Sequence, residues 1–204
     1  MSNGLIEIRA KRYYREPGVR QTCHDVKQTS NTELQDQAIQ TIARDLIGRN
    51  VVGPGDILIP APQHTGNAEY TKRIAEIVSR ETGAVTAGIL KCIPHFSWFE
   101  AKQAGKHVHL GLYLSGTIPA GRRCYFIDNV ISTGRTFTEA NRLFKGNLCP
   151  LVYAVDETKE RELLKNGLMI RTSVREKLQN LKTERSSDIM KAQLGDKYKN
   201  AERM

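Results

Sequence analysis

The stretch of sequence that decides the fold spans residues 124–136 and reads Cys-Tyr-Phe-Ile-Asp-Asn-Val-Ile-Ser-Thr-Gly-Arg-Thr. Its first four residues form a continuous apolar run, which predicts a strand of a parallel sheet that is buried on both faces. The run ends at Asp128 and Asn129, and a small, hydroxyl-rich turn centred on Gly134 comes next. A helix is expected directly after this turn, over 137–144. The stretch therefore predicts a strand–turn–helix unit.

Strands and helices alternate on both sides of this unit. Short apolar runs predict further strands, and apolar residues at helical spacing predict further helices. The expected strands cover 5–8, 57–59, 84–90, 107–114 and 151–155, and the expected helices cover 33–47, with Thr32 as its N-cap, and 68–80. This alternation predicts an α/β fold, with a mainly parallel sheet flanked by helices.

The chain is expected to have three parts. Residues 1–55 form an N-terminal flank, residues 56–156 form the core, and residues 157–204 form a charged, basic, mostly helical tail with few apolar anchors. Within the core, the pattern breaks down over 91–107, which predicts a long loop. Long loops inside a compact domain are uncommon and often functional.

Composition limits the classes of function. The 204 residues carry a formal net charge of +9, which favours an anionic partner such as nucleic acid, a membrane surface or a phosphorylated small molecule. No stretch approaches 18 uninterrupted apolar residues, so no membrane-spanning helix is expected. The first residues lack the pattern of a secretory leader, and the four cysteines are scattered. These features predict a cytoplasmic protein with reduced cysteines.

The turn that follows the predicted strand at 124–127 has the composition of an anion site. Successive backbone N–H groups at a turn before a helix point at one spot, where the helix dipole favours negative charge. The hydroxyls of Ser132, Thr133 and Thr136 can add donors, and Arg135 can add charge. Asp128 and Asn129 stand one step upstream, where they can hydrogen-bond sugar hydroxyls. A strand–turn–helix without a ligand is the alternative.

Residues 126–136 resemble the signature of type I phosphoribosyltransferases, in which a strand, two acidic residues and two apolar residues precede a Thr-Thr-Gly-x-Thr-like loop. The resemblance implies that this loop binds the 5-phosphate of phosphoribosyl pyrophosphate (PRPP) and that the acidic pair binds the ribose. By this resemblance, Asp128 and Asn129 bind the ribose. The 5-phosphate is bound, by the same resemblance, by Ser132, Thr133, Gly134, Arg135 and Thr136.

The resemblance extends in order and spacing over about half of the chain. The loop after the 57–59 strand looks like the pyrophosphate-binding loop of the family, formed here by Ala61, Pro62, Gln63, His64, Thr65 and Gly66. Residues 91–107 lie where the family carries its catalytic loop, so Lys102 and Lys106 join Asp128 and Asn129 as candidate catalytic residues. An ordinary solvated loop is the alternative for either lysine, and an exposed loop histidine is the alternative for His64. In the family, flanks such as 1–55 build a variable hood over the base.

The resemblance implies transfer of a 5-phosphoribosyl group from PRPP to a nucleobase or related nitrogen heterocycle, with release of pyrophosphate. Mg²⁺ is the expected cofactor, held mainly by substrate oxygens, with Asp128 as the one protein side chain that could reach it. Homodimers are common in the family, and the sequence itself leaves the oligomeric state open. Nucleic acid is a secondary partner, and no membrane partner is expected.

One position departs from the family pattern. Asn129 stands at the second acidic position, and an amide cannot supply negative charge to a cationic sugar. The alternative function is therefore a non-catalytic sensor of PRPP or nucleotides on the same fold that contacts nucleic acid. The basic, aromatic segment Arg9–Arg15 motivates it, although an edge strand with a solvated face explains that segment equally well. Under the enzyme hypothesis, Asn129→Asp is expected to preserve or raise turnover.

Overall fold

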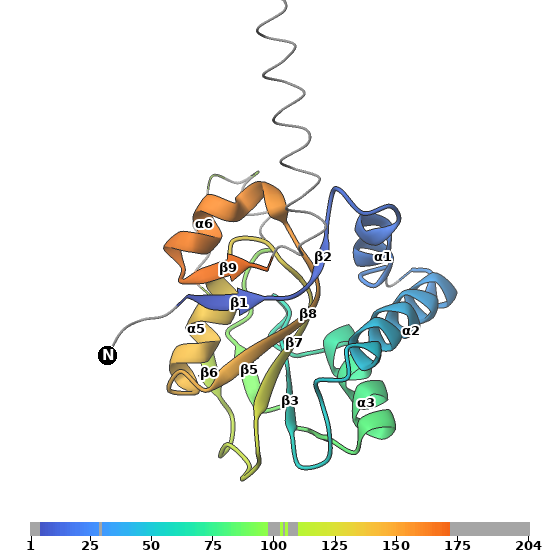
Figure 1. The fold of residues 1–204 in the computed structure, drawn as a ribbon. Coiled ribbons are helices and arrows are strands. Elements are labelled where there is room, and N and C mark those ends of the chain that lie inside the picture. The colour runs from blue at the N-terminus through green and yellow to red at the C-terminus, as the bar shows by residue number, and fades with distance from the viewer. Residues whose placement is uncertain (1–4, 29, 98–102, 104, 106–109, 172–204) are drawn as a thin grey trace, which may run out of the picture. The chain divides into compact units, whose positions relative to one another are not determined.

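A five-stranded parallel sheet lies at the centre of the fold (Figure 1). A computed structural model of the chain describes residues 5–28, 30–97, 103, 105 and 110–171. The strand order is β2–β8–β7–β3–β4, and all four pairings are parallel. The strands are β2 (Lys11–Arg12), β3 (Ile57–Pro60), β4 (Val85–Thr86), β7 (Cys124–Ile131) and β8 (Leu148–Val155). The predicted α/β fold with a mainly parallel sheet flanked by helices is confirmed.

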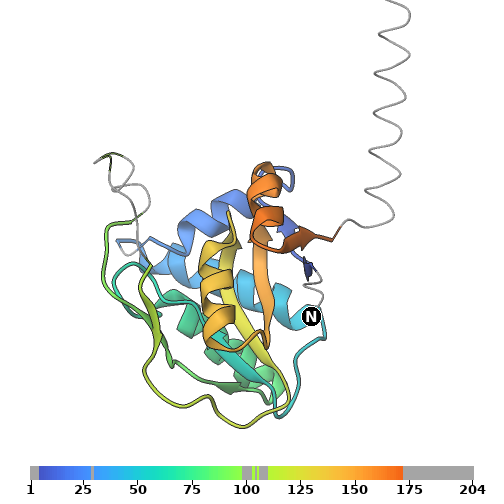
Figure 2. The ribbon, with the colours of Figure 1, turned by 90° about the vertical axis from the view of Figure 1, so that its left-hand side faces the viewer.

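Helices cover both faces of this sheet, as Figures 1 and 2 show. One face carries α1 (Val19–Asp25), α2 (Thr32–Gly48) and α3 (Tyr70–Thr82). The other carries α5 (Arg135–Leu143), and α6 (Glu160–Lys165) follows a short 3-10 helix, η1 (Glu157–Lys159). Two smaller sheets complete the fold: β1 (Ile6–Ile8) pairs in parallel with β9 (Leu168–Ile170), and β5 (Leu90–Cys92) pairs antiparallel with β6 (Leu112–Leu114).

The alternation of side chains along each strand divides the core into two layers, because successive residues of a strand point to opposite faces. On β7, Tyr125 and Ile127 pack with α1, α2 and α3, whereas Phe126 packs with α5. On β3, Leu58 belongs to the first layer, and Ile57 and Ile59 belong to the second. The central strands are thus buried on both faces, as the continuous apolar run at 124–127 predicted.

Local signals explain where the helices begin and end. The side chain of Asn31 accepts a hydrogen bond from the Leu34 amide at 3.1 Å and caps α2, so the predicted cap at Thr32 is wrong by one residue. Gly83 ends α3 in the left-handed conformation. Helix α5 begins at Arg135 rather than at Phe137, which brings its first turn directly onto the turn at Gly134.

Other predicted boundaries were wrong in informative ways. The expected strand 84–90 is two separate strands, β4 at the edge of the central sheet and β5 in the small antiparallel pair. The expected loop 91–107 therefore starts inside β5, and of the expected strand 107–114 the structure describes β6 at its end. Helix α1 lies in the N-terminal flank and was not predicted. Strand β7 continues to Ile131, four residues past the apolar run.

The contacts of the chain define two units, residues 1–170 and residues 171–204. Residues 157–170 were assigned to the tail by their charge, but they belong to the first unit. Leu163 of α6 and Leu168 of β9 are fully buried among residues of the second layer. Apart from Arg171, the second unit lies outside the described residues, and so does the predicted helical character of the tail there. Among the helices that are described, none has the length and apolar character needed to cross a bilayer.

The neighbouring leucines of α6 test whether residues 157–170 belong to the core. Leu163 is fully buried, and Leu164 is 43% exposed. We expect Leu163→Ala to lower the free energy of unfolding by about 2–5 kcal/mol, because it leaves a cavity in the second layer. Leu164→Ala, the matched control, should change it by about 0.5 kcal/mol or less. Urea unfolding followed by circular dichroism measures both changes. Equal effects of the two substitutions would mean that residues 157–170 do not belong to the core.

Candidate functional site

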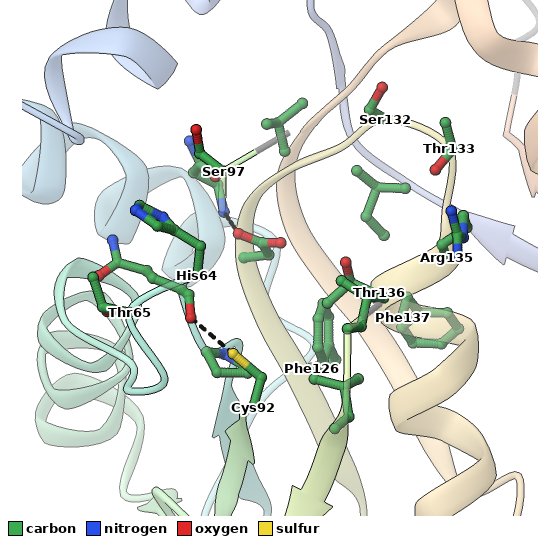
Figure 3. A pocket seen from close by; sticks show the side chains of 18 of the residues that line it. His64, Thr65, Cys92, Ser97, Phe126, Ser132, Thr133, Arg135, Thr136 and Phe137 are labelled. Atoms are coloured by element: carbon green, nitrogen blue, oxygen red, sulfur yellow. Dashed lines mark hydrogen bonds between the residues drawn. The ribbon is translucent and has the colours of Figure 1, made fainter. Parts of the chain in front are cut away.

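A cavity of about 610 Å³ opens at the carboxyl ends of β3 and β7. The two strands stay paired until Pro60 lies opposite Ile127, and from Asp128 to Ile131 β7 pairs with β8 alone. The space beside this unpaired edge of β7 becomes the cavity. In open α/β sheets, this end of the strands is where ligands bind. Figure 3 shows Ser132, Thr133 and Arg135 on one side, and His64, Thr65 and Ser97 on the other.

The turn 132–136 forms one wall of the cavity, and all five of its predicted residues line it. Gly134 has φ +81°, which favours glycine, and it caps the N-terminus of α5. The amides of Thr133, Gly134 and Thr136 have no acceptor within the described residues. Unpaired amides at the N-terminus of a nine-residue helix are suited to an anion.

Residues from the end of the first unit support this turn from behind. The side chain of Asn166 donates a hydrogen bond to the Thr133 carbonyl at 2.8 Å. A Cβ atom at Gly134 would overlap Leu168 Cδ1 and would lie 3.3 Å from Leu163 Cδ2, so the turn packs directly on α6 and β9. The Ser132 hydroxyl donates to the buried carboxylate of Asp156 at 3.4 Å. Residues 157–170 therefore shape the candidate anion site.

The loop after β3 forms the opposite wall. Pro62, Gln63, His64 and Thr65 line the cavity, whereas Ala61 is buried beneath it and Gly66 turns the chain at φ +106°. The amides of His64 and Thr65 have no acceptor in the part of the chain that the structure describes. They are exposed and give this loop its own pair of donors for an anion.

Strand β5 holds the 61–66 loop in place. The Cys92 thiol donates to the Gln63 carbonyl at 2.9 Å, and the Cys92 amide donates to the Gly66 carbonyl at 3.2 Å. Burial raises the pKa of Cys92, which keeps the thiol protonated as a donor. The His95 amide donates to the His64 carbonyl at 2.9 Å. The loop is thus anchored through its carbonyls, which leaves the His64 and Thr65 amides available to a ligand.

Asp128 lies between the two walls. Burial raises its pKa to about 6, although nearby Lys27 and the hydrogen bond from the Asn129 amide to Asp128 Oδ1, at 2.8 Å, act in the opposite direction. A carboxyl group that is held in a desolvated place beside a cavity is a candidate functional group. Lys27 comes from the turn after α1 and lines the same cavity.

Asn129 borders the cavity, but its side chain is turned into the protein. The residue is 1% exposed. Its Oδ1 accepts a hydrogen bond from the Tyr70 hydroxyl at 3.2 Å, and its Nδ2 donates to the Cys23 carbonyl at 3.1 Å. The predicted ribose contact would compete with these two bonds.

Sequence reasoning missed several cavity residues. Lys27, Tyr70, Cys92 and His95 all line it. Tyr70 follows the 61–66 loop closely and could have been found as the first residue of the next helix, but Lys27 carries no local signal. Of the predicted catalytic residues, Lys102 and Lys106 lie outside the described residues.

The basic segment Arg9–Arg15 is partly engaged within the fold. Lys11 and Arg12 form the edge strand β2, and Arg12 is 6% exposed. Lys11 Nζ lies 3.5 Å from an Asp45 oxygen and 3.7 Å from a Glu16 oxygen. The segment therefore resembles the edge-strand alternative more than an open cationic surface.

The residues of the cavity suit a metal ion that arrives with its ligand. Across 5–28, 30–97 and 110–171, no group of three or more His, Cys, Asp or Glu side chains could hold a metal. Asp128 offers one carboxylate. A single carboxylate combined with phosphate oxygens is an arrangement that Mg²⁺ commonly adopts, because this ion keeps several waters and substrate ligands.

Comparison with models of known protein families gave no match, and comparison with curated protein sequences gave none either.

The raised pKa of Asp128 predicts a pH-dependent stability. The folded protein binds this proton more tightly than the unfolded chain does, so the stabilisation is complete below pH 4 and is lost as pH rises through about 6. Asp128→Asn stays neutral and can still accept from the Asn129 amide. Between pH 4 and pH 7, we expect the variant to gain on the order of 2 kcal/mol relative to the parent protein. Urea unfolding at both pH values measures the difference, and a constant difference would contradict the desolvation of Asp128.

Two glycines with the same backbone angle test the packing behind the anion turn. Gly134 has φ +81° and Gly146 has φ +82°, but only a Cβ at Gly134 meets neighbouring atoms. Gly146→Ala should cost about 1–2 kcal/mol for the left-handed backbone alone. Gly134→Ala should cost clearly more, because Leu168 must move as well. Thermal unfolding measures both losses of stability. Equal losses would mean that the side chain of Leu168 can move aside at no cost.

Proposed function

We propose that the protein is a phosphoribosyltransferase that moves the 5-phosphoribosyl group of PRPP to a nitrogen of a nucleobase or related heterocycle. One observation carries the proposal: two loops with unpaired amides face each other across one cavity, and Asp128 lies between them. PRPP has the same order of groups, a phosphate at one end, a pyrophosphate at the other and a sugar between them. The resemblance of residues 126–136 to the family signature supports the same assignment.

Each wall has a role in this proposal. The amides and hydroxyls of 132–136 bind the 5-phosphate at the N-terminus of α5. The amides of His64 and Thr65 receive the pyrophosphate, whose negative charge grows as it leaves. Asp128 accepts hydrogen bonds from the ribose hydroxyls. With the 5-phosphate and ribose held, the anomeric carbon is oriented between the leaving group and the incoming nitrogen.

The reaction breaks the bond between the anomeric carbon and the pyrophosphate oxygen and forms a bond from that carbon to the acceptor nitrogen. The nitrogen loses a proton, so the products are a nucleotide, pyrophosphate and H⁺. Mg²⁺, bound through substrate oxygens with Asp128 as its protein ligand, would neutralise pyrophosphate charge. The chain's own contribution is orientation, exclusion of water and donors for the leaving anion.

A sensor of PRPP or nucleotides that does not catalyse transfer is the second candidate. The observation that favours it is the neutral, buried side chain of Asn129, which supplies no charge to a cationic sugar. Such a protein would bind PRPP in the same cavity and release no pyrophosphate with any base. Contact with nucleic acid would then appear as binding that weakens steeply with salt.

The experiment is a thermal melt with PRPP and Mg²⁺. At about 100 times its dissociation constant, PRPP should add about 2.7 kcal/mol of stability, which is roughly 5–10 °C in Tm for a protein of this size. Thr133→Val keeps the shape of the side chain and removes the hydroxyl in the anion turn. We expect it to weaken PRPP binding about tenfold, since hydrogen bonds to charged groups are strong.

Thr41→Val is the matched control, because Thr41 is exposed on α2 and does not line the cavity. It should bind PRPP as the parent protein does. No shift in the parent at millimolar PRPP, or equal shifts in all three proteins, would contradict the assignment of the 5-phosphate. Pyrophosphate release in the presence of a panel of bases then separates the enzyme from the sensor.

A further inference from the structure

A buried chain of hydrogen bonds runs beneath the cavity. The hydroxyl of Tyr70, the first residue of α3, donates a hydrogen bond to Asn129 Oδ1 at 3.2 Å. Asn129 Nδ2 donates to the Cys23 carbonyl at 3.1 Å, and the Asn129 amide donates to Asp128 Oδ1 at 2.8 Å. The chain starts at α3 and reaches α1. The next residue of α3, Thr71, donates to the Ala61 carbonyl of the 61–66 loop at 2.6 Å.

We propose that Asn129 is a positioning residue whose buried amide joins the start of helix α3, which follows the 61–66 loop, to the end of β7 and helix α1 around the cavity, with Tyr70 as the connecting side chain. The inference rests on the proposed function for what is positioned, namely Asp128 and the pyrophosphate loop. The connection itself rests on the hydrogen bonds alone. Tyr70 and Asn129 are 7% and 1% exposed, so water competes little for these bonds.

The geometry requires an amide at this position. The Tyr70 hydroxyl donates, so it needs an acceptor, whereas the Cys23 carbonyl accepts, so it needs a donor. Asparagine offers one of each, and aspartate at neutral pH offers acceptors only. Replacing Asn129 with aspartate would set a carboxylate against the Cys23 carbonyl and beside the Asp128 carboxyl, in a buried place.

The same bonds explain how the N-terminal flank reaches the site. The Cys23 thiol donates to the Asn129 carbonyl at 3.7 Å. Two hydrogen bonds between Cys23 and Asn129 therefore connect α1 to the end of β7. Burial raises the pKa of Cys23 to about 12, which keeps this thiol protonated. Lys27 follows α1 by two residues and lines the cavity beside Asp128. The position of Lys27 therefore depends on the bonds of Asn129.

Asn129→Asp, which the sequence predicts to preserve or raise turnover, should be less stable than the parent protein. The variant should lower the equilibrium constant for folding about tenfold or more, because a buried carbonyl loses its donor. Urea unfolding at neutral pH, without ligand, measures the loss. A variant as stable as the parent protein would overturn the proposal.

Tyr70→Phe tests the positioning role with the ring left in place. Tyr125→Phe is its matched control, since Tyr125 lies in the same core layer, is 5% exposed and donates to the Val51 carbonyl at 2.7 Å away from the cavity. Both variants lose a buried hydroxyl. Only Tyr70→Phe should shift the NMR signal of the Asn129 amide and weaken PRPP binding several-fold.

The outcomes separate this inference from the proposed function. If the parent protein fails to bind PRPP, the proposed function fails, and the amide signal and the stability of Asn129→Asp still decide the connection. If the parent binds PRPP and Tyr70→Phe changes neither the amide signal nor the affinity, the positioning role is wrong and the proposed function stands. An altered amide signal with unchanged affinity would also overturn the positioning role.

Discussion

The candidate site depends on the unequal lengths of two neighbouring strands. Strand β3 stops at Pro60, and β7 continues from Ile127 to Ile131 with β8 as its only partner in the sheet. A strand edge without a partner inside a compact unit leaves space, and here that space is the cavity. Both walls of the cavity follow from this difference in length. The loop after β3 starts level with Ile127, whereas the turn after β7 starts four residues further along the same end of the sheet.

The position of Asp128 has a cost for stability that its surroundings only partly offset. The carboxyl group sits where the strand leaves its buried section, and burial raises its pKa to about 6. Lys27 and the Asn129 amide favour the ionised form but do not restore the pKa to its ordinary value. Natural proteins bury ionisable groups at a cost in stability mainly at functional sites, where the group is needed for chemistry. The desolvated carboxyl is therefore a stronger indication of function than its position in a motif.

Local patterns predicted the parts of the fold that depend on local forces. The apolar run at 124–127 and the helical spacing of α2 and α3 led to the right elements, because period and burial are visible within a few residues. The charged composition of 157–170 concealed Leu163 and Leu168, which are buried in a cluster with residues far away in the sequence, such as Ile8 and Phe137. The expected strand 84–90 failed because one apolar run serves two different sheets. The engagement of Asn129 with Cys23 joins residues 106 positions apart, which no spacing rule reveals.

The cavity draws on distant parts of the chain, and this argues against a self-sufficient core at 56–156. Helix α1 brings Lys27 to one side, and α6 with β9 supports the anion turn from the other. Asn129 links the first of these segments to α3 through Tyr70, and Asn166 links the second to Thr133. The neutral Asn129 beside Asp128 therefore has a structural role besides lacking a negative charge. It allows the end of β7 to be fixed by hydrogen bonds to α1 and α3, and a precisely held carboxylate can orient a sugar without a second one.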